Sequence, residues 1–363
     1  MPQASVGPGA SRCGNSVRAM HDRAPYAAVK GATAAAMGCQ RMQIASPVPA
    51  ISVLTPAFDV ARFVGTAVDS VLAQSFPDWE MVVVDDGSRD GTAEVVAARR
   101  DPRIRLLQQE NRGVSAARSR AIAAARGDAI LFLDADDWLA PHALARLLEA
   151  LEAAPAAVGA AGPFAFVAEG AGPGDAPIRV KIPRFGPGDI LERLCVENLF
   201  ANGGHVLLRR EAVCRAGGFL DHLRFGEDWE YWVRLALQGP FTVAPGRDPV
   251  LFLRQRAGSA YHRMARDPAA FAPVMDAIFG SPALAERLGP ARCAWLRRRA
   301  EAENAWILGR ELIRHGQRAE GLARLRASVA AAPSLKRALL LAAALASPLL
   351  PDGLRGPFAR YAA

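Results

Sequence analysis

The chain has 363 residues, of which 51% are hydrophobic and 22% are charged, and its formal net charge is +8. This length and hydrophobic content predict a globular protein with a substantial core, and they exclude a disordered or fibrous chain. Residues 1–49 hold five basic residues and one acidic residue. Residues 50–286 hold 25 basic and 30 acidic residues, and residues 287–363 hold 14 basic and five acidic residues. The mildly acidic centre argues against nucleic-acid binding, and the basic ends favour contact with an anionic surface.

Two features of the chain bear on its location. No apolar segment of the signal-peptide kind follows the early basic residues. The longest apolar run, residues 338–350, has 13 residues, whereas a helix that spans a bilayer needs about 20. We therefore expect a cytoplasmic protein. Residues 1–46 are rich in Ala, Gly, Ser and Pro without a sustained period, which predicts a disordered segment or translated upstream sequence with the true start at Met42.

From Pro47 onward the hydrophobic pattern predicts strands that alternate with helices. Strands are expected at residues 51–54, 80–84, 104–108, 129–133, 205–208 and 250–253, and helices at 62–74, 91–100, 114–126, 144–151 and 228–237. Such alternation is typical of βαβ units with a parallel sheet. Residues 155–188 are rich in Gly and Pro and predict loops with short strands. From residue 269 the pattern is helical only.

Two of the expected strands end in clusters of carboxylates. The clusters are Asp85-Asp86 after residues 81–84, and Asp134-Ala135-Asp136-Asp137 after residues 130–133. Ligands of open α/β sheets bind at the carboxyl ends of the strands, so these side chains are expected to line one crevice. Because like charges repel unless a cation or a donor-rich ligand lies between them, the pattern predicts a site for a divalent metal and a phosphate-bearing molecule.

Five short motifs follow one another in order along the chain. They are Ser-Val-Leu-Thr-Pro-Ala-Phe-Asp at 52–59, Val-Asp-Asp-Gly-Ser at 84–88, Asn-Arg-Gly with Ala-Ala-Arg at 111–118, Phe-Leu-Asp-Ala-Asp-Asp at 132–137, and Gly-Glu-Asp-Trp at 226–229. In these motifs the chain resembles the inverting nucleotide-sugar glycosyltransferases of family 2, over roughly residues 50–260. The resemblance implies the GT-A fold, an α/β class with a Rossmann-like, mixed but mostly parallel sheet flanked by helices, followed here by a C-terminal all-helical extension. The expected divisions are a nucleotide-sugar-binding half at 47–150, an acceptor-binding and catalytic-base half at 151–265, and a basic helical extension at 266–363.

The resemblance also implies which residues hold the donor and a divalent cation, Mn²⁺ or Mg²⁺. The donor-binding candidates are Pro56, Phe58, Asp59, Asp85, Asp86, Arg118 and Asp134, and the metal candidates are Asp136, Asp134 and Asp137. Phe58 offers a π-face on which a planar base could stack, although a phenylalanine buried in the core is the open alternative. Arg118 could contact the diphosphate or anchor the region of Asp86, and Asp137 could instead cap the following helix.

Two carboxylates, Glu227 and Asp228, begin the expected helix after Gly226. Inversion at an anomeric carbon needs a carboxylate opposite the leaving group, and the resemblance implies this role for Asp228. Adjacent Glu227 would raise the proton affinity of Asp228. Both could alternatively stabilise the helix start. Arg256 stands where members of the family often have a histidine near the metal.

The function that follows is transfer of a sugar from a nucleoside-diphosphate sugar to an acceptor hydroxyl, with inversion and metal dependence, in the assembly of cell-surface polysaccharide or glycolipid. The expected partners are the donor and a glycan or lipid-linked acceptor, with no nucleic acid. The alternative is a catalytically weak scaffold that binds sugar nucleotides in a polysaccharide-assembly complex. A nucleotidyltransferase is a third possibility, but residues 56–59 lack the Gly-rich, basic phosphate loop that such enzymes have.

The basic extension carries five leucines beside Lys336 and Arg337. They are Leu335, Leu339, Leu340, Leu341 and Leu345. This segment could lie at the surface of an anionic membrane, as a peripheral contact on its cytoplasmic face. The alternative is that the leucines pack against the preceding helical hairpin.

Overall fold

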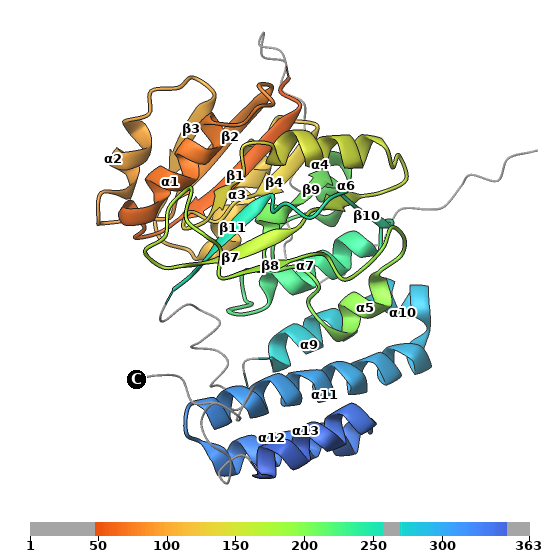
Figure 1. Cartoon of the computed structure of the whole chain (residues 1–363). Helices are drawn as coiled ribbons and strands as arrows, with labels where there is room; N and C mark the ends of the chain where they lie inside the picture. Colours follow the sequence, from red (N-terminus) through yellow and green to blue (C-terminus); the bar gives the residue numbers. More distant parts are fainter. Residues whose placement is uncertain (1–47, 257–268, 270, 347–363) are drawn as a thin grey trace, which may run out of the picture. The chain divides into compact units, whose positions relative to one another are not determined.

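A computed structural model of the chain describes residues 48–256, 269 and 271–346. The expectation of disorder for residues 1–46 falls outside the described residues. Figure 1 shows the arrangement of the described elements.

The central element is a seven-stranded sheet with the order β10-β6-β9-β4-β1-β2-β3. Its strands are β1 (Ile51–Ala57), β2 (Trp79–Asp85), β3 (Ile104–Gln108), β4 (Ala129–Phe132), β6 (Gly159–Ala161), β9 (Val206–Arg209) and β10 (Phe241–Val243). Strand β9 pairs antiparallel with both β4 and β6, and all other pairs are parallel. The predicted mixed, mostly parallel sheet is therefore confirmed, and it draws strands from both predicted halves of the catalytic region.

A second, four-stranded sheet takes two of its strands from residues 155–188, where the Gly- and Pro-rich pattern predicts loops with short strands, and one from the strand predicted at 250–253. Its order is β5-β11-β7-β8, with β5 (Trp138–Leu139), β7 (Phe164–Ala168), β8 (Arg179–Lys181) and β11 (Leu251–Gln255). Strands β7 and β11 pair in parallel although they are far apart in the sequence. This sheet brings the segment after the second carboxylate cluster next to the last strand of the catalytic region.

Helices cover both faces of the seven-stranded sheet. They are α1 (Ala61–Leu72), α2 (Thr92–Ala97), α3 (Val114–Ala124), α4 (Ala143–Glu152), α5 (Leu191–Val196), α6 (Arg210–Ala216) and α7 (Glu227–Ala236), with a 3₁₀ turn at Gly203–His205. In β2, Met81 and Val83 belong to the apolar cluster that includes α1 and α4, whereas Val82 and Val84 belong to the cluster that includes α3 and α7. Burial on both faces explains why the strands read as continuous apolar runs.

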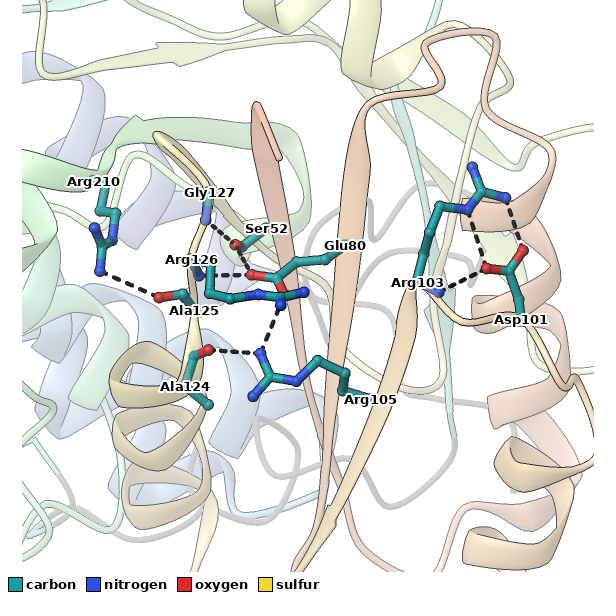
Figure 2. A network of polar contacts seen from close by, with 10 residues as sticks. All are labelled: Ser52, Glu80, Asp101, Arg103, Arg105, Ala124, Ala125, Arg126, Gly127 and Arg210. Atoms are coloured by element: carbon teal, nitrogen blue, oxygen red, sulfur yellow. Dashed lines mark hydrogen bonds and ion pairs between the residues drawn. The ribbon is translucent and has the colours of Figure 1, made fainter. Parts of the chain in front are cut away.

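A buried polar network ties the amino ends of the central strands together (Figure 2). Glu80 is 1% exposed and accepts hydrogen bonds from Ser52 Oγ at 2.7 Å and from the backbone N–H of Arg126 at 2.6 Å. Arg105 Nη1 also donates to Glu80 at 3.2 Å. Burial works to raise the pKa of Glu80, but the hydrogen bonds from Ser52 and Arg126 outweigh it and the pKa is lowered. The network fixes the end of the sheet opposite to the carboxylate clusters.

The C-terminal part of the described chain is helical, as the pattern predicts. Its helices are α9 (Ala272–Phe279), α10 (Pro282–Leu288), α11 (Pro290–Arg314), α12 (Arg318–Ala331) and α13 (Leu335–Ala346). Helices α11 and α12 form a hairpin and pack side by side (Figure 1). Of the five leucines near Lys336 and Arg337, Leu340 and Leu341 pack against the apolar cluster of the hairpin, as one of the two alternatives predicts. The other three leucines are exposed. None of the described helices is both long enough and apolar enough to cross a membrane.

Candidate active site

Arg118 joins the second carboxylate cluster to the start of α7. Its Nη2 donates to Asp134 Oδ1 and its Nη1 to Glu227 Oε1, each at 2.9 Å, and the side chain is 7% exposed. Burial works to lower the pKa of this guanidinium, but the charges of Asp134 and Glu227 raise it, so Arg118 stays a cation. Both terminal nitrogens of Arg118 thus donate to carboxylates, and the predicted alternatives of a contact with the diphosphate or an anchor for the region of Asp86 stay predictions.

Asp228 lies beside this ion-paired group. Gly226, with a φ of 74° in the left-handed region that favours glycine, turns the chain into α7 and places Glu227 and Asp228 at its first positions. Asp228 Oδ2 accepts from Asn198 Nδ2 at 3.3 Å, and Oδ1 accepts from the N–H of Trp229 at 2.7 Å. Burial and the neighbouring charge of Glu227 raise the pKa of Asp228 to about 7. A carboxylate with that pKa can both take and give a proton near neutral pH.

Asp137 is held by protein groups on both of its oxygens. Asn202 Nδ2 donates to Asp137 at 2.6 Å and to Asp134 at 3.1 Å, and the backbone N–H of Arg254 donates to Asp137 at 2.8 Å. Burial, followed by the charges of Asp136 and Asp134, raises the pKa of Asp137 well above its usual range. The expected cap on the following helix is wrong, because α4 begins at Ala143 after His142 and has no side-chain cap. Asp137 instead connects the cluster to β11.

Asp136 is the carboxylate of the cluster that points to Arg256. Arg256 Nη1 lies 2.8 Å from Asp136 Oδ2. Burial and the charge of Asp134 raise the pKa of Asp136, and the bond from Arg256 opposes this rise. The arginine that replaces the family's histidine therefore contacts the residue predicted to bind the metal.

A second group of candidates lies after β1 and β2. Phe58 is 48% exposed, so the alternative of a core phenylalanine is wrong and the ring is accessible for stacking. Asp59 has a φ of 47°, accepts from the N–H of Arg89 at 2.9 Å and donates its own N–H to Ser88 Oγ at 3.0 Å. Pro56 is buried within β1, where it is in register with Val84.

Asp85 and Asp86 are both almost fully buried. Asp86 accepts from Gln109 Nε2 at 2.7 Å and from the N–H groups of Arg112 and Gly113 at 2.9 and 2.8 Å. Asp85 accepts from the N–H of Ser88 at 3.1 Å. Asp86 thus secures the entry to α3, the helix that carries Arg118. Within the described residues, no hydrogen bond or ion pair joins this group directly to the group of Asp134, and the predicted contacts to base and ribose stay predictions.

The charge of the site suits a divalent cation. The site contains five carboxylates and three guanidinium groups, which leaves an excess of two negative charges when all are ionised. The carboxylates are those of Asp134, Asp136, Asp137, Glu227 and Asp228, and the guanidinium groups are those of Arg118, Arg254 and Arg256. Carboxylate oxygens are the ligands that Mg²⁺ and Mn²⁺ prefer. In the described part of the chain, no three His, Cys, Asp or Glu side chains are arranged as a ready metal site. The donor set therefore fits the ion in charge and chemistry, provided that Arg256 leaves Asp136.

Three polar residues of this site were missed in the sequence: Asn198, Asn202 and Arg254. The two glycines that follow Asn202 are the sequence signal that could have identified it. A Cβ on Gly203 would come within 2.5 Å of Phe132 Cβ, and a Cβ on Gly204 would come within 2.7 Å of Leu251, so larger residues do not fit there. Two successive glycines after an asparagine mark a close backbone approach. That approach carries Asn202 to the carboxylates that follow β4.

Comparison with known proteins finds similarity to glycosyltransferases. Residues 52–214 match the family model "Glycosyl transferase family 2". The chain is 43% identical over 112 residues to the succinoglycan biosynthesis protein ExoO of Rhizobium meliloti, which covers 31% of this chain and 32% of ExoO. It is 39% identical over 107 residues to the uncharacterized glycosyltransferase EpsJ of Bacillus subtilis, which covers 29% of this chain and 31% of EpsJ. The matches thus span about a third of these curated relatives.

Solved structures resemble the chain over most of its length. TarS 1–349 of S. aureus has a TM-score of 0.55 at 16% identity, with 84% of each chain covered. The mannosyltransferase PcManGT of Pyrobaculum calidifontis, solved with GDP-Man and Mn²⁺, has a TM-score of 0.50 at 24% identity, with 83% of this chain and 81% of PcManGT covered. These likenesses concern the fold. Residues 52–214 of this chain thus match the model of glycosyltransferase family 2, and the mixed α/β fold with its mostly parallel central sheet is that of GT-A proteins.

Proposed function

We propose that the chain is an inverting glycosyltransferase that moves a sugar from a nucleoside-diphosphate sugar to an acceptor hydroxyl. The observation that carries the proposal is the link through Arg118, which couples Asp134 after β4 to Glu227 at the start of α7, where Asp228 lies. One end of the link supplies carboxylates for a metal and a donor, and the other supplies a proton acceptor. A scaffold has no need for a carboxylate whose pKa is raised to about 7 beside such a group.

In the proposed reaction, Asp228 removes the proton from the acceptor hydroxyl as the hydroxyl oxygen attacks the anomeric carbon. The new C–O bond forms on the face opposite the leaving group, and the bond from the anomeric carbon to the diphosphate breaks. The nucleoside diphosphate leaves with the electron pair, and the anomeric configuration inverts. Asn198, which donates to Asp228, keeps that carboxylate oriented, and Glu227 remains paired with Arg118.

The cation of this proposal is Mn²⁺ or Mg²⁺, which Asp136, Asp134 and Asp137 would hold. When bound, such an ion would neutralise the charge that develops on the leaving diphosphate. Phe58 is proposed to stack on the base, with Pro56, Asp59, Asp85 and Asp86 shaping the same side of the pocket. Arg118 acts as a positioning residue, since both of its terminal nitrogens are engaged by carboxylates.

The proposed class of substrate is inferred from the relatives and structural neighbours. ExoO is a succinoglycan biosynthesis protein, TarS has been solved with UDP-GlcNAc, and PcManGT with GDP-Man and Mn²⁺. We propose that this chain uses a donor of the same chemical class and a glycan or lipid-linked acceptor in polysaccharide or glycolipid assembly. We further propose that it works in the cytoplasm, at the inner face of the membrane.

The test is a panel of sugar nucleotides incubated with Mn²⁺ and candidate acceptors, with release of nucleoside diphosphate as the readout. NMR of the product then reports the anomeric configuration. We expect turnover with at least one donor, loss of that turnover on chelation, and an inverted product. Tight binding of a donor and Mn²⁺ without turnover for any acceptor would favour the scaffold. A retained anomeric configuration would contradict direct displacement with Asp228 as base.

A further inference from the structure

The helical extension contains a cavity of about 380 Å³. Helix α11 lines it on one side, and the end of α12 with the start of α13 lines it on the other, all beyond the residues of the family match. The lining residues that matter here are Trp295, Arg298, Arg299, Lys336, Arg337 and Leu340. At about 30 Å³ for each water molecule, the cavity has room for roughly a dozen of them. It could therefore accept a group considerably larger than a single ion.

The cavity has an excess of positive charge. Arg337 is paired with Glu303 at 2.7 Å, but Arg298, Arg299 and Lys336 have no carboxylate partner in the described part of the chain. Several basic residues of the extension outside the cavity are paired: Arg287 with Asp189, Arg292 with Glu192, Arg297 with Asp276 and Glu301, and Arg324 with Glu320. Because like charges held close together repel, three unpaired cations around one cavity are stabilised by an anion between them.

Apolar side chains flank the same cavity. Leu335 is 76% exposed and Leu339 is 62% exposed, and these residues neighbour Lys336 and Leu340 of the lining in the sequence. Four residues apart on α13, the two leucines share one side of the helix. Trp295 is 36% exposed, with the guanidinium carbons of Arg292 and Arg299 at 4.1 and 4.7 Å from its ring centre. Exposed leucines beside unpaired cations match a ligand that is anionic at one end and apolar at the other.

We propose that this cavity binds the phosphate headgroup of an anionic phospholipid. Arg298, Arg299 and Lys336 contact the phosphate, while Leu335 and Leu339 enter the boundary between headgroups and acyl chains. The guanidinium groups of Arg292 and Arg299 lie against the ring of Trp295, so this ring is less available to stack on a soluble sugar. The combination of basic residues with leucines and a tryptophan is typical of segments that lie in a membrane interface.

The experiment is co-sedimentation of the full chain with vesicles of phosphatidylcholine, alone or mixed with phosphatidylglycerol, at low and high salt. We expect binding only to the mixed vesicles, weakened by salt. Lys336→Glu should weaken that binding about tenfold or more, since it removes one attraction at the surface and adds one repulsion. Arg326→Glu is the matched control, because Arg326 is exposed on α12, has no carboxylate partner in the described residues and lies outside the cavity. It should change the affinity less than about threefold.

A second pair of measurements separates a lipid from a soluble phosphate compound. Leu335→Ser with Leu339→Ser should weaken vesicle binding, whereas calorimetry with glycerol 3-phosphate should give only weak binding to the unchanged chain. No binding to mixed vesicles at low salt would overturn the proposal. So would equal losses in Lys336→Glu and Arg326→Glu, which indicate diffuse charge attraction, or unchanged vesicle binding in the leucine variant together with tight binding of glycerol 3-phosphate. None of these outcomes depends on catalysis.

Discussion

Replacing Arg118 by methionine is expected to lower the free energy of unfolding by about 3–5 kcal/mol, the usual cost of breaking a buried ion pair by removing one partner. The side chain is 7% exposed and makes two ion pairs of 2.9 Å, with Asp134 and Glu227. At about 4 Å and an effective dielectric constant near 20, each attraction amounts to roughly 4 kcal/mol before desolvation is subtracted. Methionine fills similar space but leaves Asp134, Glu227 and Asp228 without the cation between them.

The assay is guanidinium denaturation followed by tryptophan fluorescence, with Arg99→Met as the control. Arg99 also donates twice to one carboxylate, that of Asp69, but Asp69 is 58% exposed. Exposed pairs contribute about 0–1 kcal/mol, so the control should lose little stability. Adding Glu227→Gln to Arg118→Met should restore part of the loss, because it removes one of the unpaired charges. A loss below about 1 kcal/mol in Arg118→Met would refute the view that this arginine holds the site together.

Three further changes test the parts of the site. Arg256→Ala should strengthen Mn²⁺ binding measured by calorimetry, by about tenfold if the pair with Asp136 opposes the metal by ~1.4 kcal/mol; unchanged affinity would mean that Arg256 does not compete. Turnover should rise with pH and reach half its maximum near pH 7, because Asp228, whose pKa is raised to about 7, accepts a proton only when ionised; a flat profile between pH 6 and 8 argues against this base. Phe58→Ala should weaken donor binding by about 1–3 kcal/mol and Phe58→Tyr should not, if the exposed ring stacks on a base.

The sheet was predictable because its strands carry their own signal. Residues 81–84 are apolar without interruption because α-helices cover both faces of the strand, and the alternation of Met81 and Val83 with Val82 and Val84 divides them between two cores. The position of the carboxylates after β2 and β4 at one edge of the sheet was also predictable from the sequence, because parallel strands bring their carboxyl ends to the same edge. The second sheet was less predictable, because β11, although expected as a strand, pairs with β5 and β7, which lie far from it in the sequence.

The hydrogen bonds and ion pairs between the candidate residues could not be predicted from the sequence. Arg118 was singled out by its motif, but its partners lie 16 and 109 residues away in the sequence, so no local pattern indicates them. Asn202 and Arg254 approach Asp137 through a turn and a strand whose positions depend on the whole fold. Arg256 was recognised as a departure from the family, and only its contact with Asp136 gives that departure a physical consequence.

Asp228→Asn tests the central claim most directly, with turnover and donor affinity measured on the same preparation. The substitution keeps the shape of the side chain and its capacity to accept from Asn198, but an amide cannot take the proton of the acceptor hydroxyl. We predict that turnover falls by about 10² or more while the donor and Mn²⁺ bind as in the unchanged chain. Near-native turnover in Asp228→Asn would contradict the account, because the base of the reaction would then have to be another group.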